Sequence, residues 1–150
     1  MAKRKKQNWC IGDIFLVPLA DGTFSVGQVI ARYKDALNSV VCIFTTSRIK
    51  KLESEVTINE DEIISALFVT PDFLDSGDWL VVGSWPPVPV EHYFDTDALK
   101  ADGFVGVKVV GSGIVINFIE ACFGLYPWDG FFEADYLDKL LLSPEKNRKT

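Results

Sequence analysis

Three strand-like segments follow one another at the start of the chain, with only short turns between them. Residues 13–19 are mostly apolar and lead into Asp21-Gly22, a pair typical of hairpin turns because glycine accepts the positive φ of a tight turn. Residues 24–33 alternate between two faces, and residues 39–46 are dense in β-branched and aromatic side chains. We therefore expect the fold to begin with an antiparallel three-stranded meander. The two expected faces of the second segment are Phe24, Val26, Gln28 and Ile30 on one side and Ser25, Gly27, Val29 and Ala31 on the other.

Three further strands are predicted, over residues 63–70, 79–85 and 104–110. Between the last two, the segment Trp85-Pro86-Pro87-Val88-Pro89 lacks the backbone donors of a paired strand, so we expect an extended, polyproline-like crossing. The remaining connections are predicted to be a loop or irregular helix over residues 47–62, a turn over residues 72–77 and a polar connection over residues 91–103.

Helical patterns are confined to the C-terminal part. Phe118, Cys122 and Leu125 recur at helical spacing, and Gly124 provides a stop signal. The start is open between a cap at Ser112 and a capping box formed by Asn117 with Glu120. A second helix is predicted over residues 133–142, with Tyr136, Leu137, Leu140 and Leu141 on one face.

Strands first and helices last indicate an α+β fold with a mostly antiparallel sheet. The architecture we favour is a small, partly closed barrel with the two C-terminal helices packed on it. A chain of 150 residues is one domain long. We expect a basic flexible arm over residues 1–8, a single globular domain over residues 9–142 and a polar tail over residues 143–150.

Charge is distributed unevenly along the chain. Removing the +4 of residues 1–6 and the +2 of residues 145–150 from the net charge of −6 leaves −12 for the body between them. Such a body repels nucleic acid and membrane surfaces and attracts basic proteins. The same acidity would also serve simply to keep an apolar domain in solution.

The sequence lacks the usual signatures of an enzyme. His92 is the single histidine, and we expect it in a solvated loop. Cys10, Cys42 and Cys122 are widely spaced and each lies among apolar residues, so we expect buried, reduced thiols rather than a metal site or disulfides. Gly111-Ser112-Gly113 is too short for a dinucleotide loop. We therefore predict no catalytic residues, no metal and no cofactor.

The N-terminus has some features of a signal peptide, because four basic residues precede an apolar stretch. Gly12, Asp13 and Pro18 interrupt that stretch, and the apolar pattern resumes after the turn. No segment reaches the roughly 20 uncharged residues that a membrane span needs. We expect a cytoplasmic location and no membrane partner, and keep a signal peptide as the alternative.

Three stretches resemble the immunity protein 26 family of bacterial polymorphic toxin systems. They are Gly12-Asp13-Ile-Phe-Leu-Val-Pro-Leu with Asp21-Gly22 and Gly27-Gln28-Val29; Trp79-Leu-Val-Val-Gly83-Ser84; and Gly124-Leu125-Tyr126-Pro127-Trp128-Asp129 followed by Tyr136-Leu137-Asp138-Lys139-Leu140-Leu141. Members often carry Asp-Pro shortly before that tyrosine, where this chain has Glu133-Ala134. The resemblance implies a mainly β protein that binds and neutralises a cognate toxin; it transfers no catalytic or binding residues.

An acidic partner can cover the basic cleft of a toxin that attacks nucleic acid, so we expect the toxin-facing surface to be acidic; a nuclease is one candidate for the toxin, whose identity the sequence does not give. Asp72, Asp75 and Asp78 are the first choice for that surface, followed by Glu60, Asp61 and Glu62. The alternative for the first triplet is a local role, in which Asp72 caps a helical turn after Pro71 and Asp75 and Asp78 bracket Gly77. Two other functions are kept open. One is a small-barrel module that binds nucleic acid or peptide through the basic arm and Trp85-Pro86-Pro87, and the other is a carboxylate-based hydrolase.

Overall fold

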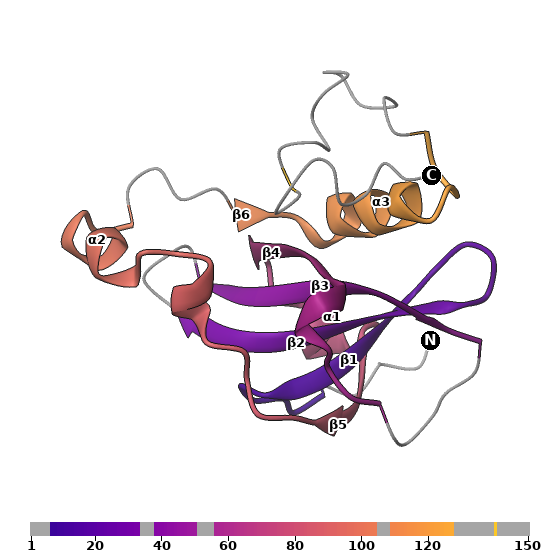
Figure 1. Cartoon of the computed structure of the whole chain (residues 1–150), viewed down its shortest axis with the longest axis horizontal. Helices are drawn as coiled ribbons and strands as arrows, with labels where there is room; N and C mark the ends of the chain where they lie inside the picture. The colour runs from indigo at the N-terminus through magenta and orange to yellow at the C-terminus, as the bar shows by residue number, and fades with distance from the viewer. Residues whose placement is uncertain (1–6, 34–37, 51–55, 105–108, 128–139, 141–150) are drawn as a thin grey trace.

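The computed structural model describes residues 7–33, 38–50, 56–104, 109–127 and Leu140. In chain order its elements are β1 (Asp13–Pro18), β2 (Phe24–Tyr33), β3 (Ser39–Ile49), η1 (Glu60–Glu62), β4 (Ile63–Val69), α1 (Asp72–Ser76), β5 (Leu80–Ser84), η2 (Val90–His92), α2 (Thr96–Ala101), β6 (Val109–Val110) and α3 (Ser112–Cys122), where η marks a 3-10 helix. Figure 1 shows a sheet accompanied by a few short helices, so the predicted α+β class is confirmed.

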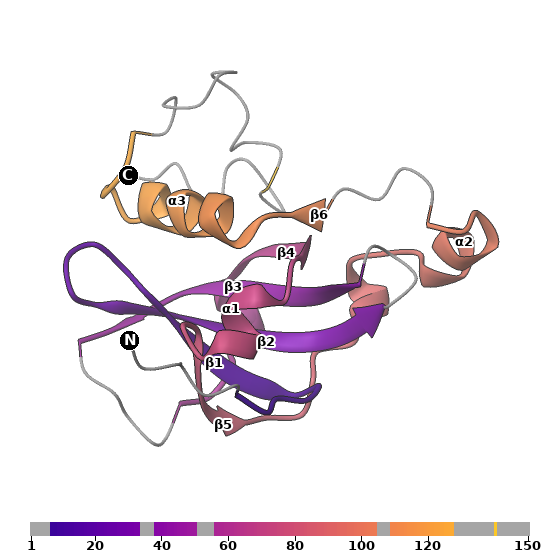
Figure 2. The same cartoon turned by 180° about the vertical axis from the view of Figure 1, so that it is seen from behind.

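The strands form one six-stranded sheet in the order β5-β1-β2-β3-β4-β6. Every pair is antiparallel except β4 with β6, which is parallel and spans only two residue pairs. Figures 1 and 2 show β5 and β6 at opposite edges. The sheet is therefore open, and the predicted partial closure into a barrel is wrong: no described strand bridges the two edges.

The predicted hairpin forms at Asp21-Gly22. Gly22 has a φ of 85°, and the Asp21 carboxylate accepts hydrogen bonds from the backbone N–H and the hydroxyl of Thr23. The strand that follows has the predicted limits, but its alternation fails at Ala31, which lies on the same side as Ile30. The pairing of β2 with β3 shifts register between Val29 and Ala31, so the irregularity turns Ala31 to the other face.

Both faces of the sheet are covered, which explains why its strands are nearly continuous runs of apolar residues. One face, which we call the α3 face, packs against α1, Trp79 and α3; its core includes Phe15, Val29, Phe44, Leu74, Trp79, Val115 and Phe118. The other, the α2 face, packs against η2 and the segment around α2; its core includes Ile14, Val26, Val41, Ile43, Phe68 and Val88.

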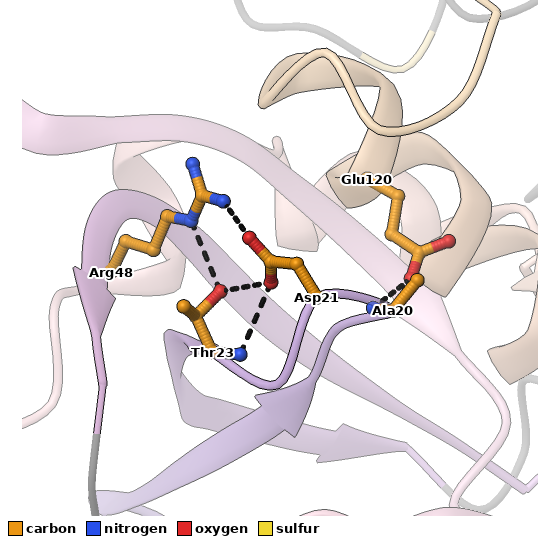
Figure 3. Close-up of polar contacts among 5 residues, drawn as sticks. All are labelled: Ala20, Asp21, Thr23, Arg48 and Glu120. Atoms are coloured by element: carbon orange, nitrogen blue, oxygen red, sulfur yellow. Dashed lines mark hydrogen bonds and ion pairs between the residues drawn. The ribbon is translucent and has the colours of Figure 1, made fainter.

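Helix α3 begins at Ser112 and has no side-chain cap, so the capping box predicted at Asn117 is wrong. The predicted stop at Gly124 is confirmed: its φ is 78°, its N–H donates to the Ala121 carbonyl, and the Leu125 N–H donates to the Glu120 carbonyl over 2.7 Å. The second predicted helix lies outside the described residues except for Leu140. The C-terminal half of α3 is tied to the β1–β2 turn, because the Glu120 carboxylate accepts a hydrogen bond from the Ala20 N–H at 2.6 Å (Figure 3).

Arg48 completes this junction. Its guanidinium forms an ion pair with Asp21 and donates to the Thr23 hydroxyl (Figure 3). It also lies 4.9 Å from the ring centroid of Phe123. Reaching this position requires β3 to continue to Ile49, past the predicted end at residue 46. The later part of β3 is paired with the start of β2, a partnership that its polar composition does not reveal.

Two other predictions fail where the chain is polar. The connection over residues 91–103 contains η2 and α2, and the turn after Pro71 is the short helix α1. In α2, Asp95 is the N-cap and accepts a hydrogen bond from the Ala98 N–H at 3.0 Å. Phe104, predicted to begin a strand, has a φ of 62°, and β6 contains only Val109–Val110.

Candidate functional site

The acidity of the body is concentrated in one stretch. Residues 52–99 contain eleven carboxylates and no lysine or arginine. In the structure the described carboxylates of this stretch, apart from Glu62, form two separate groups. We call Asp72, Asp75 and Asp78 the α1 acidic cluster, and Glu60, Asp61, Glu91, Asp95 and Asp97 the η acidic surface.

The α1 acidic cluster lies on and beside a helix of five residues that packs against the core. Helix α1 begins after Pro71 and ends at Gly77, whose φ is 86°. Leu74 is fully buried, and the Phe73 ring lies edge-on to Trp79 with 5.9 Å between the centroids. These contacts belong to the α3 face, so the cluster lies on that side of the sheet.

Asp72 is exposed, but its carboxylate serves as a connector. One oxygen accepts hydrogen bonds from the Thr70 and Ser112 hydroxyls, each at 2.7 Å. Partial burial disfavours the charged form, yet these two hydroxyls outweigh it and hold the pKa of Asp72 below its usual value. Asp72 thus links the end of β4 to the start of α3.

Asp75 connects α1 to the N-terminal segment. Its carboxylate accepts a hydrogen bond from the Trp9 indole N–H at 2.8 Å, and its carbonyl accepts one from the Gln7 N–H at 2.7 Å. The Gln7 side-chain amide also donates to the carbonyls of Leu74 and Trp79 and accepts from the Val81 N–H, each at 2.9 Å. Gln7, assigned from the sequence to the flexible arm, is therefore hydrogen-bonded to α1 and the start of β5.

Asp78 completes the α1 acidic cluster beside the end of the helix. Its carboxylate accepts a hydrogen bond from the Ser76 hydroxyl at 2.9 Å. All three carboxylates of the cluster are therefore engaged inside the protein.

The η acidic surface lies over the α2 face. Asn59 caps η1 by accepting from the Asp61 N–H at 3.0 Å, which leaves the side chains of Glu60 and Asp61 exposed. Glu62, the third residue of that predicted group, instead accepts a hydrogen bond from the Ser47 hydroxyl at 2.7 Å. Ile58 and Ile63 on either side of η1 are buried in the α2-face core, which places these carboxylates on that face.

An aromatic cluster holds η2 and α2 on the sheet. The Phe94 ring lies edge-on to Phe68 with 4.9 Å between the centroids, and Tyr33 contacts both Phe68 and Phe104. The polar side chains of the same segment consequently face solvent: Glu91, Asp95 and Asp97 are exposed.

Residues 91–97 line a hollow of about 440 Å³. Partial burial and, second, the charge of Glu60 raise the pKa of Tyr93, whereas burial and the charge of Glu91 raise the pKa of Tyr33. The field of Glu60 in η1 therefore reaches the lining of the hollow, about 30 residues further along the chain.

The six residues predicted for partner binding do not form one surface. Asp72, Asp75 and Asp78 lie on the α3 face, and Glu60, Asp61 and Glu62 lie on the α2 face. The structure adds Glu91, Asp95 and Asp97 to the second group. The feature of the sequence that could have identified them is the absence of lysine and arginine from the whole stretch. It indicates the acidic surface better than the spacing of any three carboxylates does.

The residues with catalytic potential are dispersed. His92 is exposed, as predicted, and its ring lies edge-on to Tyr93. All three cysteines are free, and burial raises the pKa of Cys122 to about 12; Cys10, however, is exposed beside Asp13, contrary to prediction, because it precedes the first strand. Within the described residues no three His, Cys, Asp or Glu side chains are grouped to hold a metal ion. In that part of the chain no helix has the length and apolarity to cross a membrane.

The sequence matches the model of a family of immunity proteins. The family is described as Immunity protein 26, and the match covers residues 11–100, more than half of the chain. The chain therefore belongs to the immunity protein 26 family, as the resemblance implied. The matched span contains β1 to β5, η1, η2 and the α1 acidic cluster, whereas the stretch that begins at Gly124 lies beyond it. Searches among curated proteins and among solved structures return no match.

Proposed function

We propose that this protein neutralises a cognate bacterial toxin by binding it non-covalently through the η acidic surface, without turnover of its own. Membership of an immunity protein family supports the class of function. The observation that supports this surface is the group of exposed carboxylates around the hollow at residues 91–97, within a stretch that lacks lysine and arginine.

An acidic surface without neighbouring cations attracts basic partners. Glu60, Asp61 and Glu91 have no cationic side chain beside them in sequence, so their field extends into solvent. A toxin that acts on nucleic acid carries a basic cleft for phosphates, and carboxylates can occupy that cleft and speed the encounter. The proposed toxin is therefore one with a basic active-site cleft, as in a nuclease.

We prefer the η acidic surface to the α1 acidic cluster because of the state of the carboxylates in the free protein. Asp72 and Asp75 already accept hydrogen bonds from Ser112 and Trp9 on other elements, and a toxin would have to compete with those contacts. Glu60, Asp61 and Glu91 would meet a cationic partner without breaking an internal contact of this kind.

Co-expression with toxins of the producing bacterium tests the proposal. Growth should be rescued by the wild-type chain with one toxin, and the two purified proteins should form a complex while the toxin's substrate stays intact in their presence. A variant with Glu60→Gln, Asp61→Asn and Glu91→Gln should protect less well at equal abundance. Failure of the wild-type chain to protect against every toxin of its own strain would contradict the proposed function.

A nucleic-acid binding assay distinguishes the proposed function from the alternative, a module that binds nucleic acid through the basic arm. We expect no binding to DNA or RNA at physiological salt, because phosphates and the acidic stretch repel each other. Tight binding that disappears when residues 1–6 are removed would support the alternative instead.

A further inference from the structure

Trp85, which directly follows β5, has an exposed side chain. Among the described residues the exposed large apolar side chains are Ile11 at 50%, Leu80 at 41% and Trp85 at 41% exposure. The Trp85 N–H donates to the Gly12 carbonyl at 3.0 Å, so Ile11 lies next to Trp85 along the paired chain. Pro86 and Pro87 are also exposed. We call Ile11, Trp85, Pro86 and Pro87 the Trp85 ridge.

A buried glutamine holds the ridge in place. Gln28 is fully buried, and its amide N–H groups donate to the carbonyls of Gly12 and Trp85 at 3.1 and 2.9 Å. The Pro86 carbonyl lies 3.4 Å from the same nitrogen, and the side-chain oxygen accepts from the Val88 N–H at 3.3 Å. One side chain on β2 thereby satisfies backbone groups along a segment that cannot join the sheet.

Gly12 permits the close approach of the two chains. Its φ is 101°, and a Cβ at this position would lie 3.1 Å from the Trp85 carbonyl oxygen. Together with the fixed φ of the prolines, these contacts give the exposed segment one conformation. In both views it connects β5 to η2 along one side of the sheet (Figures 1 and 2).

A preorganised apolar ridge is what an interface anchor requires. Ordering a flexible segment on binding costs free energy, and a segment already held by Gln28 avoids that cost. Tryptophan is enriched among the residues that dominate binding energy, particularly where charged groups surround a desolvated centre. Exposed carboxylates follow the ridge along the chain, since Glu91 of the η acidic surface lies four residues after Pro87.

We propose that the Trp85 ridge inserts into an apolar pocket bordered by cationic side chains on the toxin, with Trp85 as the anchor of the complex. The inference rests on the proposed function and adds the apolar centre to its acidic surroundings. Charge complementarity determines the occupant: the exposed carboxylates of Glu91, Asp95 and Asp97 that follow the ridge disfavour an acidic partner and favour a basic one.

Substitution of Trp85 tests the proposal against a control of equal exposure. The dissociation constant of the complex with the toxin identified by the protection assay is measured for wild type, Trp85→Ala and Leu80→Ala. Trp85→Ala should weaken binding by about 30-fold or more, the loss typical of an anchor residue. Leu80 is equally exposed but lies at the other end of β5, so Leu80→Ala should change binding less than about 3-fold.

The melting temperatures of both variants should match wild type, because both side chains are exposed. If Trp85→Ala were destabilised, Trp85→Phe would be measured at a temperature where it is fully folded. Its dissociation constant is expected to lie between those of Trp85→Ala and wild type. Wild-type affinity of a folded Trp85→Ala variant would contradict the proposed role of the Trp85 ridge and leave the proposed function intact. A wild-type chain that binds no toxin would overturn both.

Discussion

The two acidic regions of this protein are both short stretches rich in carboxylates, but those carboxylates have different surroundings in the structure. The α1 acidic cluster and the η acidic surface both place several carboxylates within a few residues of a short helix. In the first, Asp72 and Asp75 join α1 to α3 and to the N-terminal segment. In the second, Glu60, Asp61 and Glu91 are exposed, and Glu91 lines a hollow. The difference teaches that the neighbours of a carboxylate, and not its spacing in sequence, decide whether it stabilises the fold or remains available to a partner.

Asp72→Ala should have the largest effect on folding. It removes the acceptor shared by the Thr70 and Ser112 hydroxyls, and Ser112 is only 2% exposed. Loss of a hydrogen-bonded partner for a buried hydroxyl costs roughly 1–3 kcal/mol. Urea denaturation should therefore show a lower free energy of unfolding. An unchanged midpoint would mean that Asp72 is as dispensable as a residue of the η acidic surface.

A double-mutant cycle sharpens the same comparison at Asp75. Trp9→Phe removes the indole donor and Asp75→Ala removes its acceptor. Each substitution should destabilise the protein, and their coupling energy should be about 1 kcal/mol for a charge-assisted, partly buried bond. The matched cycle of Trp9→Phe with Asp97→Ala, on the opposite face, should show no coupling. Additivity in the first cycle would remove the proposed connector role of Asp75.

Acid should act on the α1 acidic cluster in a defined direction. The pKa of Asp72 is lowered in the folded state, so its charged form stabilises the fold above the unfolded value of about 3.9, and this contribution is lost as pH falls through the folded value. Hydrogen bonds from Thr23, followed by the interaction with Arg48, lower the pKa of Asp21 in the same direction. Between pH 5 and about pH 3, Asp72→Asn should thus lose less stability than wild type, and parallel unfolding curves would contradict this.

The smallest effect on folding is expected at the η acidic surface. Glu60→Gln, Asp61→Asn and Glu91→Gln change exposed side chains, and surface changes of this kind usually alter stability by no more than about 0.5 kcal/mol each. Asp95 is left unchanged because it caps α2, and Glu62 because it accepts a hydrogen bond from Ser47. A large fall in melting temperature would mean that these carboxylates stabilise the fold, as those of the α1 acidic cluster do.

Local signals allowed much of the sheet to be predicted. The β1–β2 hairpin and the limits of β2 depend on residues close in sequence, and they are confirmed. Ala31 was assigned to the wrong face because its orientation depends on the register with β3. The short helix α2 was missed, and α1 was anticipated only as a turn or helical turn after Pro71, because a five- or six-residue helix lacks a repeating apolar pattern and is held by caps and tertiary packing.

The candidate site was predictable only in part. Composition indicated an acidic surface, but which carboxylates share a face depends on where distant strands place the turns. Gln28 illustrates the same limit: the strand pattern predicted which face it lies on, but not its partners, which include Gly12 and groups 57 to 60 residues further along the chain. Contacts of that range are set by the complete topology, so neither the Trp85 ridge nor the division of the acidic residues could be read from local sequence.

The association rate with the identified toxin tests the central claim most directly. Two variants each lose three negative charges: one carries Glu60→Gln, Asp61→Asn and Glu91→Gln, and the other Asp72→Asn, Asp75→Asn and Asp78→Asn. Rates are measured at low and high salt, at a temperature where both variants are folded. Our account predicts that the first variant associates about 10-fold more slowly at low salt with a weaker salt dependence, while the second stays close to wild type. Equal rates for the two variants, or a slower rate for the second alone, would contradict the assignment of toxin binding to the η acidic surface.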